Sequence, residues 1–163
     1  MHIGIARRRG AVLATSAVGI AAASIAFAVP ASASSLDTHA ALGEFNAARA
    51  KLGCASLSID SDLNTAAQAH SADMAKTNNV SSKGSDRSTP DSRIADAGYS
   101  ATKTGEVQLA TPARATSLDF AKAVTGGNVK TTIADCTFTQ VGFGLQAGPN
   151  NKSYWTVDLA KPA

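Results

Sequence analysis

Few residues of this sequence could perform acid–base or nucleophilic chemistry, and Glu106 is the first to consider. It lies in "TKTGEVQLA", residues 102–110, directly after Gly105, and no other acid occurs between Asp96 and Asp119. A carboxylate at the start of a strand can act as a general acid or base if a partner group lies within hydrogen-bond reach. The alternative role is structural, in which Glu106 is hydrogen-bonded to nearby backbone or hydroxyl groups and holds the strand entrance in place.

Partners for Glu106 are scarce. We expect His39 to be exposed in the first turn of a helix, and His70 to lie on a buried stripe with Met74 as a core histidine. The sequence contains no G-x-S-x-G and no H-E-x-x-H, so neither a serine triad nor a zinc protease is predicted. Ser100-x-x-Lys103 and the overlapping Lys-Thr-Gly resemble penicillin-binding serine enzymes, but those use two separate lysines. We interpret this match as chance.

The N-terminus has the pattern of an export signal. Residues 1–10 carry three arginines and no acid, residues 11–29 are apolar, and a small-x-small sequence follows. This pattern predicts a signal peptide, residues 1–33, and an exported domain, residues 34–163. A membrane anchor is the alternative, because the apolar run nearly reaches the ~20 residues that a span needs. We expect cleavage, secretion and no membrane anchor afterwards. The arginine pair leaves open whether export is general or of the twin-arginine type.

The balance of charge changes when the signal is removed. The whole chain has 15 basic and 12 acidic residues, and the signal contributes three arginines and no acid. The expected mature chain therefore has 12 of each and is formally neutral. A nucleic-acid surface needs a basic stripe to neutralise phosphates, so no nucleic-acid partner is predicted. The remaining length, about 130 residues, predicts one domain with a core of ordinary size.

Two cysteines, Cys54 and Cys136, remain in the expected mature chain. An even pair in an exported protein predicts a disulfide, and the alternative is two separate buried thiols. A bridge would close a loop of about 80 residues, which the chain-entropy model values at roughly 4 kcal/mol. It would tie the N-terminal helices to the C-terminal strands. A zinc site is not predicted, because metal-binding cysteines come in closely spaced sets.

The hydrophobic pattern predicts an α/β domain with helices early and strands late. The first helix is expected over residues 36–52, with a stripe of Leu36, Leu42, Phe45, Arg49 and Leu52. Three more helices are expected, from Asp60 to about Thr77, from Thr89-Pro90 to Gly98, and from Thr111-Pro112 to Gly126. Residues 78–89 are expected to form a loop. "GEVQLA" is a strand candidate, and "FTQVGFGLQA" and "SYWTVDLA" alternate apolar and polar residues on either side of "GPNNK". That alternation predicts a closing antiparallel hairpin.

Six segments together resemble the CAP superfamily, the SCP-like extracellular domains of cysteine-rich secretory, antigen 5 and pathogenesis-related proteins. They are "FNAARAKLG", "LSIDSDLNTAAQAHSADMAKTN", "DSRIADAGY", "TGEVQLA", "FTQVGFGLQ" and "YWTVDLA". They occur in the family's order and span roughly residues 40–160, in the manner of a bacterial secreted member. The resemblance implies a three-layer α-β-α sandwich located outside the cell.

The resemblance also implies a cleft with two histidines and two acids, which binds a divalent metal in some members. Ser81 or Ser82 stands where the first histidine is expected. Glu106 fills one acid position, although Val107 replaces the asparagine that usually follows. The second histidine is expected within residues 126–137, which contain none. Most of the family's cleft set is therefore missing.

The last acid would come from the helix before that segment, where Asp119 is the candidate. The same helix has Phe120 where bacterial members usually have tryptophan. Serine cannot replace imidazole as a metal ligand or proton shuttle near neutral pH. We therefore predict no metal, no cofactor and no confident catalytic residue.

The function predicted from the resemblance is that of a secreted, non-enzymatic CAP-like domain. Its partner would be an extracellular lipid, wall component or protein. One alternative is a hydrolase or protease that uses the cleft around Glu106. Another is a structural or signalling envelope protein whose cleft is idle.

Overall fold

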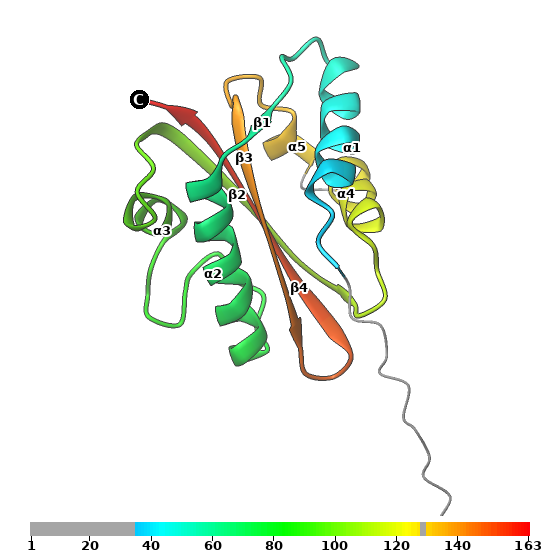
Figure 1. Cartoon of the computed structure of the whole chain (residues 1–163), viewed down its shortest axis with the longest axis vertical. Coiled ribbons are helices and arrows are strands. Elements are labelled where there is room, and N and C mark those ends of the chain that lie inside the picture. The colour runs from blue at the N-terminus through cyan, green and yellow to red at the C-terminus, as the bar shows by residue number, and fades with distance from the viewer. Residues whose placement is uncertain (1–34, 128–129) are drawn as a thin grey trace, which may run out of the picture. The chain divides into compact units, whose positions relative to one another are not determined.

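The computed structural model describes residues 35–127 and 130–163, so the predicted signal peptide lies outside the described residues. Helices predominate early in this part of the chain, and two strands end it (Figure 1). In order they are α1 (Thr38–Ala50), β1 (Ser58–Ile59), α2 (Ser61–Thr77), α3 (Pro90–Asp96), β2 (Ala101–Pro112), α4 (Ser117–Gly126), α5 (Lys130–Ile133), β3 (Gln140–Gly148) and β4 (Lys152–Pro162).

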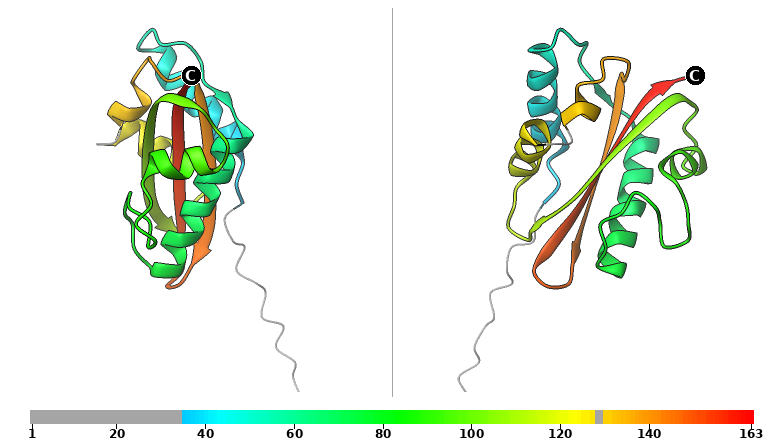
Figure 2. Two further views of the ribbon diagram at one scale, coloured as in Figure 1. Left: turned by 90° about the vertical axis from the view of Figure 1, so that its left-hand side faces the viewer. Right: turned by 180° about the vertical axis from the view of Figure 1, so that it is seen from behind.

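The strands form one mixed sheet in the order β1-β3-β4-β2. β1 runs parallel to β3, whereas β4 is antiparallel to both β3 and β2. Helices α2 and α3 lie on one side of the sheet, and α1, α4 and α5 lie on the other (Figure 2). The predicted three-layer α-β-α sandwich with a C-terminal antiparallel hairpin is therefore confirmed. No helix within the described ranges is both long and apolar enough to cross a membrane.

Local capping explains where the helices begin. Asp60 accepts backbone hydrogen bonds at the start of α2, and Thr89 forms a capping box at the start of α3, as the sequence predicts. The prediction that a helix starts at Thr111-Pro112 is wrong, because both residues belong to β2. Proline is tolerated there because β2 is an edge strand. A capping box at Thr116 starts α4 instead.

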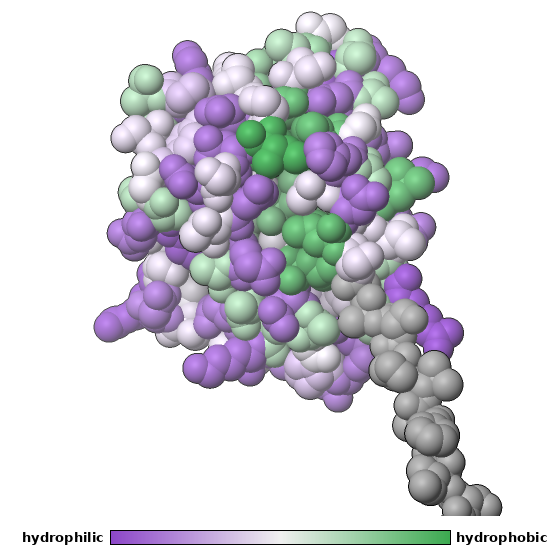
Figure 3. All heavy atoms as spheres, in the orientation of Figure 1, coloured by the Kyte–Doolittle hydropathy of each residue, from purple (hydrophilic) through white to green (hydrophobic). Residues whose placement is uncertain are grey.

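The main apolar core lies between the sheet and helices α1 and α4. Phe120 stacks on Trp155 with ring centroids 4.7 Å apart, and Phe45 and Phe143 complete the aromatic group. Half-buried aliphatic side chains border this core, and Figure 3 shows apolar atoms gathered in one region of the visible surface. The predicted α1 stripe is only partly right, because Leu52 lies beyond the end of the helix and is 59% exposed.

Helix α2 lies unusually close to the backbone of β3. A Cβ atom added at Gly142 would overlap backbone atoms of Leu63, and one added at Gly144 would overlap the backbone of Ala67. The two glycines of "GFG" therefore have no side chain that would separate the helix from the strand. The predicted buried stripe of α2, which includes His70 and Met74, is confirmed.

Two amide side chains of α2 also bond to β3 beyond the short pairing with β1. Asn64 accepts a hydrogen bond from the backbone N–H of Phe143 at 2.8 Å. Gln68 accepts from the N–H of Leu145 and donates to its carbonyl oxygen, both at 3.0 Å. These bonds satisfy backbone groups of β3 that have no strand beside them.

The disulfide between Cys54 and Cys136 is confirmed. It joins the segment after α1 to the segment before β3, with Cα atoms 4.9 Å apart and a sequence separation of 82. The bridge links the helical N-terminal part to the C-terminal strands, as the sequence predicts.

Arg49, at the end of α1, reinforces the same junction. Its side chain is fully buried and donates hydrogen bonds to four carbonyl oxygens, those of Ala55, Ile133, Asp135 and Phe138. Burial lowers the pKa of the guanidinium, and the charge of Asp135 acts in the opposite direction. Because its donors are occupied by carbonyls of the chain itself, Arg49 is a structural residue.

We predict that Gly144→Ala lowers the free energy of unfolding by about 2–3 kcal/mol, because the new methyl group would force α2 away from β3. Gly43→Ala is the matched control, since a Cβ at Gly43 meets nothing within 4 Å in helix α1. That change should stabilise by roughly 0.5–1 kcal/mol. Urea unfolding of the variants would measure both, and an unchanged Gly144→Ala midpoint would contradict the close packing.

Candidate functional site

Two acids lie next to each other on the side of the sheet that faces α2. Glu106 on β2 pairs with Asp158 on β4, and Asp158 pairs in turn with Gly142 on β3. Residues directly opposite across strands share a face of the sheet. Since Gly142 abuts α2, both carboxyl groups lie beneath that helix. Asp158 is fully buried, and the side chain of Glu106 is only 2% exposed.

Glu106 is paired with a cation. Nη2 of Arg93, from α3, lies 2.5 Å from its Oε2 atom. Nε2 of His70, from α2, lies 3.6 Å from its Oε1 atom. In its structural role Glu106 is predicted to bind backbone or hydroxyl groups, whereas the structure provides a guanidinium. Three elements that are distant in sequence therefore meet at one carboxylate.

The loop between α2 and α3 holds His70 and Arg93 in place. The carbonyl oxygen of Ser81 lies 2.7 Å from Nε2 of His70, and the carbonyl oxygen of Ser82 accepts from Nη2 of Arg93 at 3.0 Å. Because a carbonyl only accepts, Nε2 of His70 carries the proton. Ser88 accepts from the other terminal nitrogen of Arg93 through its carbonyl and hydroxyl oxygens. The serines at the expected histidine position thus contribute backbone carbonyls.

The second acid, Asp158, favours its protonated form. Burial, and then the negative charge of Glu106, raise the pKa of Asp158 well above its ordinary value. The raised pKa favours the protonated form of Asp158, in which its proton removes the repulsion between the two acids. The charge of Arg93 balances that of Glu106. We call Glu106, Arg93, His70 and Asp158 the polar cluster.

The structure does not bring the other predicted residues to the polar cluster. Asp119 is exposed on α4, on the other side of the sheet, and accepts hydrogen bonds from Thr116 that lower its pKa. His39 is exposed, as predicted. Lys103 pairs with Asp135 at 2.5 Å. Among the described residues, no group of three His, Cys, Asp or Glu side chains is placed to hold a metal ion.

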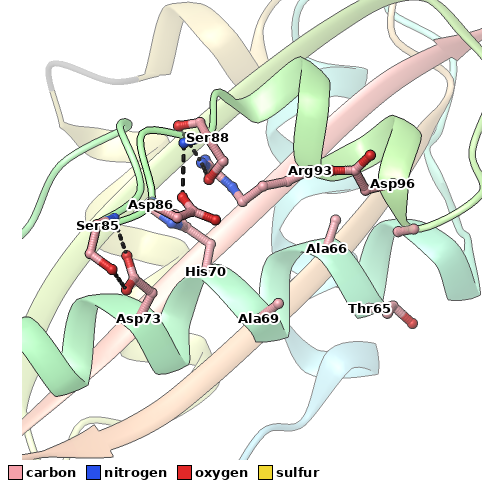
Figure 4. A pocket seen from close by; sticks show the side chains of 11 residues that line it. Thr65, Ala66, Ala69, His70, Asp73, Ser85, Asp86, Ser88, Arg93 and Asp96 are labelled. Carbon is pink, nitrogen blue, oxygen red and sulfur yellow. Dashed lines mark hydrogen bonds between the residues drawn. The ribbon is translucent and has the colours of Figure 1, made fainter.

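A pocket of about 340 Å³ lies above the polar cluster, between α2, α3 and the loop that joins them. His70 and Arg93 line it, together with Asp73, Asp86 and Asp96, whereas Glu106 does not (Figure 4). Burial acts to raise the pKa of Asp73, yet hydrogen bonds from the hydroxyl and amide of Ser85 outweigh it and leave this pKa lowered. We call this space the polar pocket.

A second pocket, of about 440 Å³, lies between α1, α4 and α5. Leu52 and Ile133 give it apolar side chains, and Lys51, Lys122 and Lys130 place three cations around it. We call it the apolar pocket. Its lysines are exposed, as is most of Leu52.

The fold is that of a small α-β-α domain, and in this chain a buried acid of β2 is held by the helices above it. The chain belongs to the cysteine-rich secretory protein family, CAP, whose family model matches residues 42–159. The resemblance noted in the sequence is thereby confirmed. No curated protein matches the sequence.

Solved structures show the same fold. An outer surface protein of Borrelia burgdorferi superposes with a TM-score of 0.67 at 18% identity, over 81% of this chain and 100% of that one. An extracellular protein of Bacillus anthracis that contains an SCP domain superposes with a TM-score of 0.62 at 20% identity. The match covers 76% of this chain and 39% of that longer one.

Sequence reasoning missed three members of the polar cluster. Arg93 lies within "DSRIADAGY", which served only as a family segment, and His70 was assigned to the core alone. The alternation of apolar and polar residues in "SYWTVDLA" does predict one thing about Asp158, that it lies on the same face of the strand as Thr156. An alternating strand normally turns its polar face to solvent. Here α2 covers that face, so the polar residues are buried.

We predict that Asp158→Asn removes a pH-dependent loss of stability. In the unfolded chain Asp158 titrates near pH 3.9, as a free aspartate does, while in the folded chain its pKa is far higher. The wild-type free energy of unfolding therefore falls as pH rises above about 4. Asparagine is neutral at every pH. As pH rises, the free energy of unfolding of the variant should therefore increase relative to that of the wild type by up to about 1.4 kcal/mol per pH unit.

Urea unfolding at several pH values between about 5 and 8 would measure this difference. Asp96→Asn is the control, because Asp96 is exposed and has no hydrogen-bond partner among the described residues. Parallel stability curves for wild type and Asp158→Asn would contradict a protonated Asp158.

Proposed function

We propose that this chain is a non-catalytic extracellular binding domain that takes an amphipathic anion, of the fatty-acid type, in the apolar pocket. The observation that carries the proposal is the pairing of an exposed leucine with three lysines around one hollow. The two parts of the proposal, absence of catalysis and choice of ligand, rest on different contacts.

The state of Glu106 supports a non-catalytic role. A general acid or base must reach the group that it protonates or deprotonates. The Glu106 carboxylate is 2% exposed, is bound by Arg93 and does not line the polar pocket. Asp158 is fully buried beside it, so neither acid is free to meet a substrate. These contacts favour a binding role over the hydrolase alternative.

The lining of the apolar pocket supports the choice of ligand. Leu52 is one of three large hydrophobic side chains that are exposed in the described part of the chain, and the buried Ile133 also lines the pocket. An acyl chain that covers Leu52 would remove apolar surface from water. The lysines outnumber the single acid of the lining, Glu44, so they favour an anionic head group. A volume of about 440 Å³ lies within the usual range for small-molecule sites.

An extracellular location is supported by the family and by its relatives. The matched family is described as secretory, and the two similar structures are an outer surface protein and an extracellular protein. The disulfide is of the kind that persists in oxidising compartments. The predicted signal peptide agrees with this assignment.

We predict that the purified protein binds palmitate, and that Leu52→Glu weakens binding by about tenfold or more, because burying a leucine is worth roughly 1.5–3 kcal/mol. Val80→Glu is the matched control, since Val80 is also exposed but does not line the apolar pocket. Isothermal titration with palmitate would measure the dissociation constants. Hexadecanol is the comparison ligand, because it keeps the chain and lacks the charge.

The outcomes separate the two parts of the proposal. Palmitate that binds the wild type and Leu52→Glu equally would place the ligand elsewhere. Hexadecanol that binds as tightly as palmitate would contradict a role for the three lysines. Hydrolysis of a general ester or peptide substrate that is lost in Glu106→Gln would contradict the non-catalytic assignment.

A further inference from the structure

We infer that the polar pocket is a second binding site, for a small primary amine that carries hydroxyl groups, such as an amino sugar. This site is separate from the apolar pocket, with which it shares no residues. Three features of its lining lead to this ligand: the charge, the unpaired polar atoms and the small side chains.

The charge of the polar pocket favours a cation. Three aspartates line it, and its arginine already neutralises Glu106 in the polar cluster. The Asp73 carboxylate is held by Ser85, and the Asp86 carboxylate by the backbone of Ser88. Asp96, in contrast, is exposed and has no hydrogen-bond partner among the described residues. It is therefore free to accept from a ligand ammonium group.

Two buried atoms of the lining lack partners and have opposite hydrogen-bonding sense. Nδ1 of His70 and Nε of Arg93 are both buried without a hydrogen bond in the described part of the chain, and their side chains are 1% and 8% exposed. Since Nε2 of His70 donates to the Ser81 carbonyl, Nδ1 is the acceptor of the neutral imidazole, whereas Nε of Arg93 is a donor. Leaving such atoms unpaired is costly.

A ligand that satisfies both atoms must offer a donor and an acceptor close together. His70 comes from α2 and Arg93 from α3, and their side chains approach each other under the Ser85–Ser88 segment (Figure 4). An ammonium group donates, and a neighbouring hydroxyl oxygen accepts. A vicinal amino alcohol therefore matches the pair, which neither a bare cation nor a simple anion does.

The remaining lining suits a sugar ring. Ala66 and Ala69 of α2 and Ala97 after α3 give the polar pocket small apolar patches, on which the C–H face of a ring can lie. Thr65 and Ser85 add hydroxyl groups at its border. Its volume, about 340 Å³, is at the small end of the range for ligand sites, which fits one ring rather than a chain.

The test uses the disulfide-bonded protein and D-glucosamine in its protonated form. Isothermal titration should show glucosamine binding about tenfold or more tightly than glucose or N-acetylglucosamine, because both comparison sugars lack the charged donor. In a ¹H–¹⁵N spectrum the Nε–H signal of Arg93 should shift as glucosamine is added. This signal reports the unpaired donor directly and does not depend on a variant.

Asp96→Asn should weaken glucosamine binding by about fivefold to tenfold, because it removes the free carboxylate. Asp91→Asn is the control, since it removes the same charge from α3 at a residue that does not line the polar pocket, and it should bind as the wild type does. A glucosamine dimer distinguishes two sources of the same ligand. Tighter binding of the dimer indicates a wall polymer, and equal binding indicates the free sugar.

Two results would overturn the inference. One is equal affinity for glucosamine, glucose and N-acetylglucosamine, which would show that the amine is not recognised. The other is an Arg93 Nε–H signal that does not move at saturating glucosamine, which would show that the sugar does not reach the lining.

Discussion

The close approach of α2 to the backbone of β3 is the constraint on which the rest of the domain depends. Gly142 and Gly144 leave no side chain between the helix and the strand, so α2 lies directly on the sheet. The contact is so close that Ser71 of α2 and Thr156 of β4 bond to each other at 2.9 Å, with both residues fully buried. The polar side of the hairpin thereby becomes an interior surface.

Burial of that surface determines the state of its acids. An ionised carboxyl group away from water needs a counter-charge or a proton. Glu106 has the first in Arg93, and the raised pKa of Asp158 favours the second. Such a set costs free energy to desolvate and contributes little net stability. Its effect is to fix α2, α3 and the loop between them relative to the sheet, and thus to shape the polar pocket.

Features that depend on neighbouring residues were predictable from the sequence, and features that depend on tertiary contacts were not. The starts of α2 and α3 follow from cap residues within a few positions, and the hairpin follows from alternation around a turn. The start of α4 was misplaced because Pro112 suits an edge strand as well as a first helical turn. Leu52 was placed in the core because the helical period was extended past the end of α1.

The candidate site was predictable only in part. Family order singled out Glu106, which the structure places in the polar cluster. No spacing rule links it to Arg93, His70 and Asp158, because these residues meet only after α2 covers the sheet. The alternation in "YWTVDLA" predicts a strand whose polar face is exposed to solvent. In the structure α2 covers that face, so its polar residues are buried. The unpaired nitrogens of His70 and Arg93 have no sequence signal, since they are unpaired only because of the hydrogen bonds that the other nitrogens of these side chains make.

The amides of Asn64 and Gln68 have a consequence beyond the packing of one helix. An exposed strand edge is a row of free donors and acceptors onto which a strand of another molecule can add. On this edge, side chains of α2 already bind the N–H of Phe143 and both the N–H and the carbonyl oxygen of Leu145. Two amides one helical turn apart therefore protect this stretch of the sheet against intermolecular strand addition and aggregation.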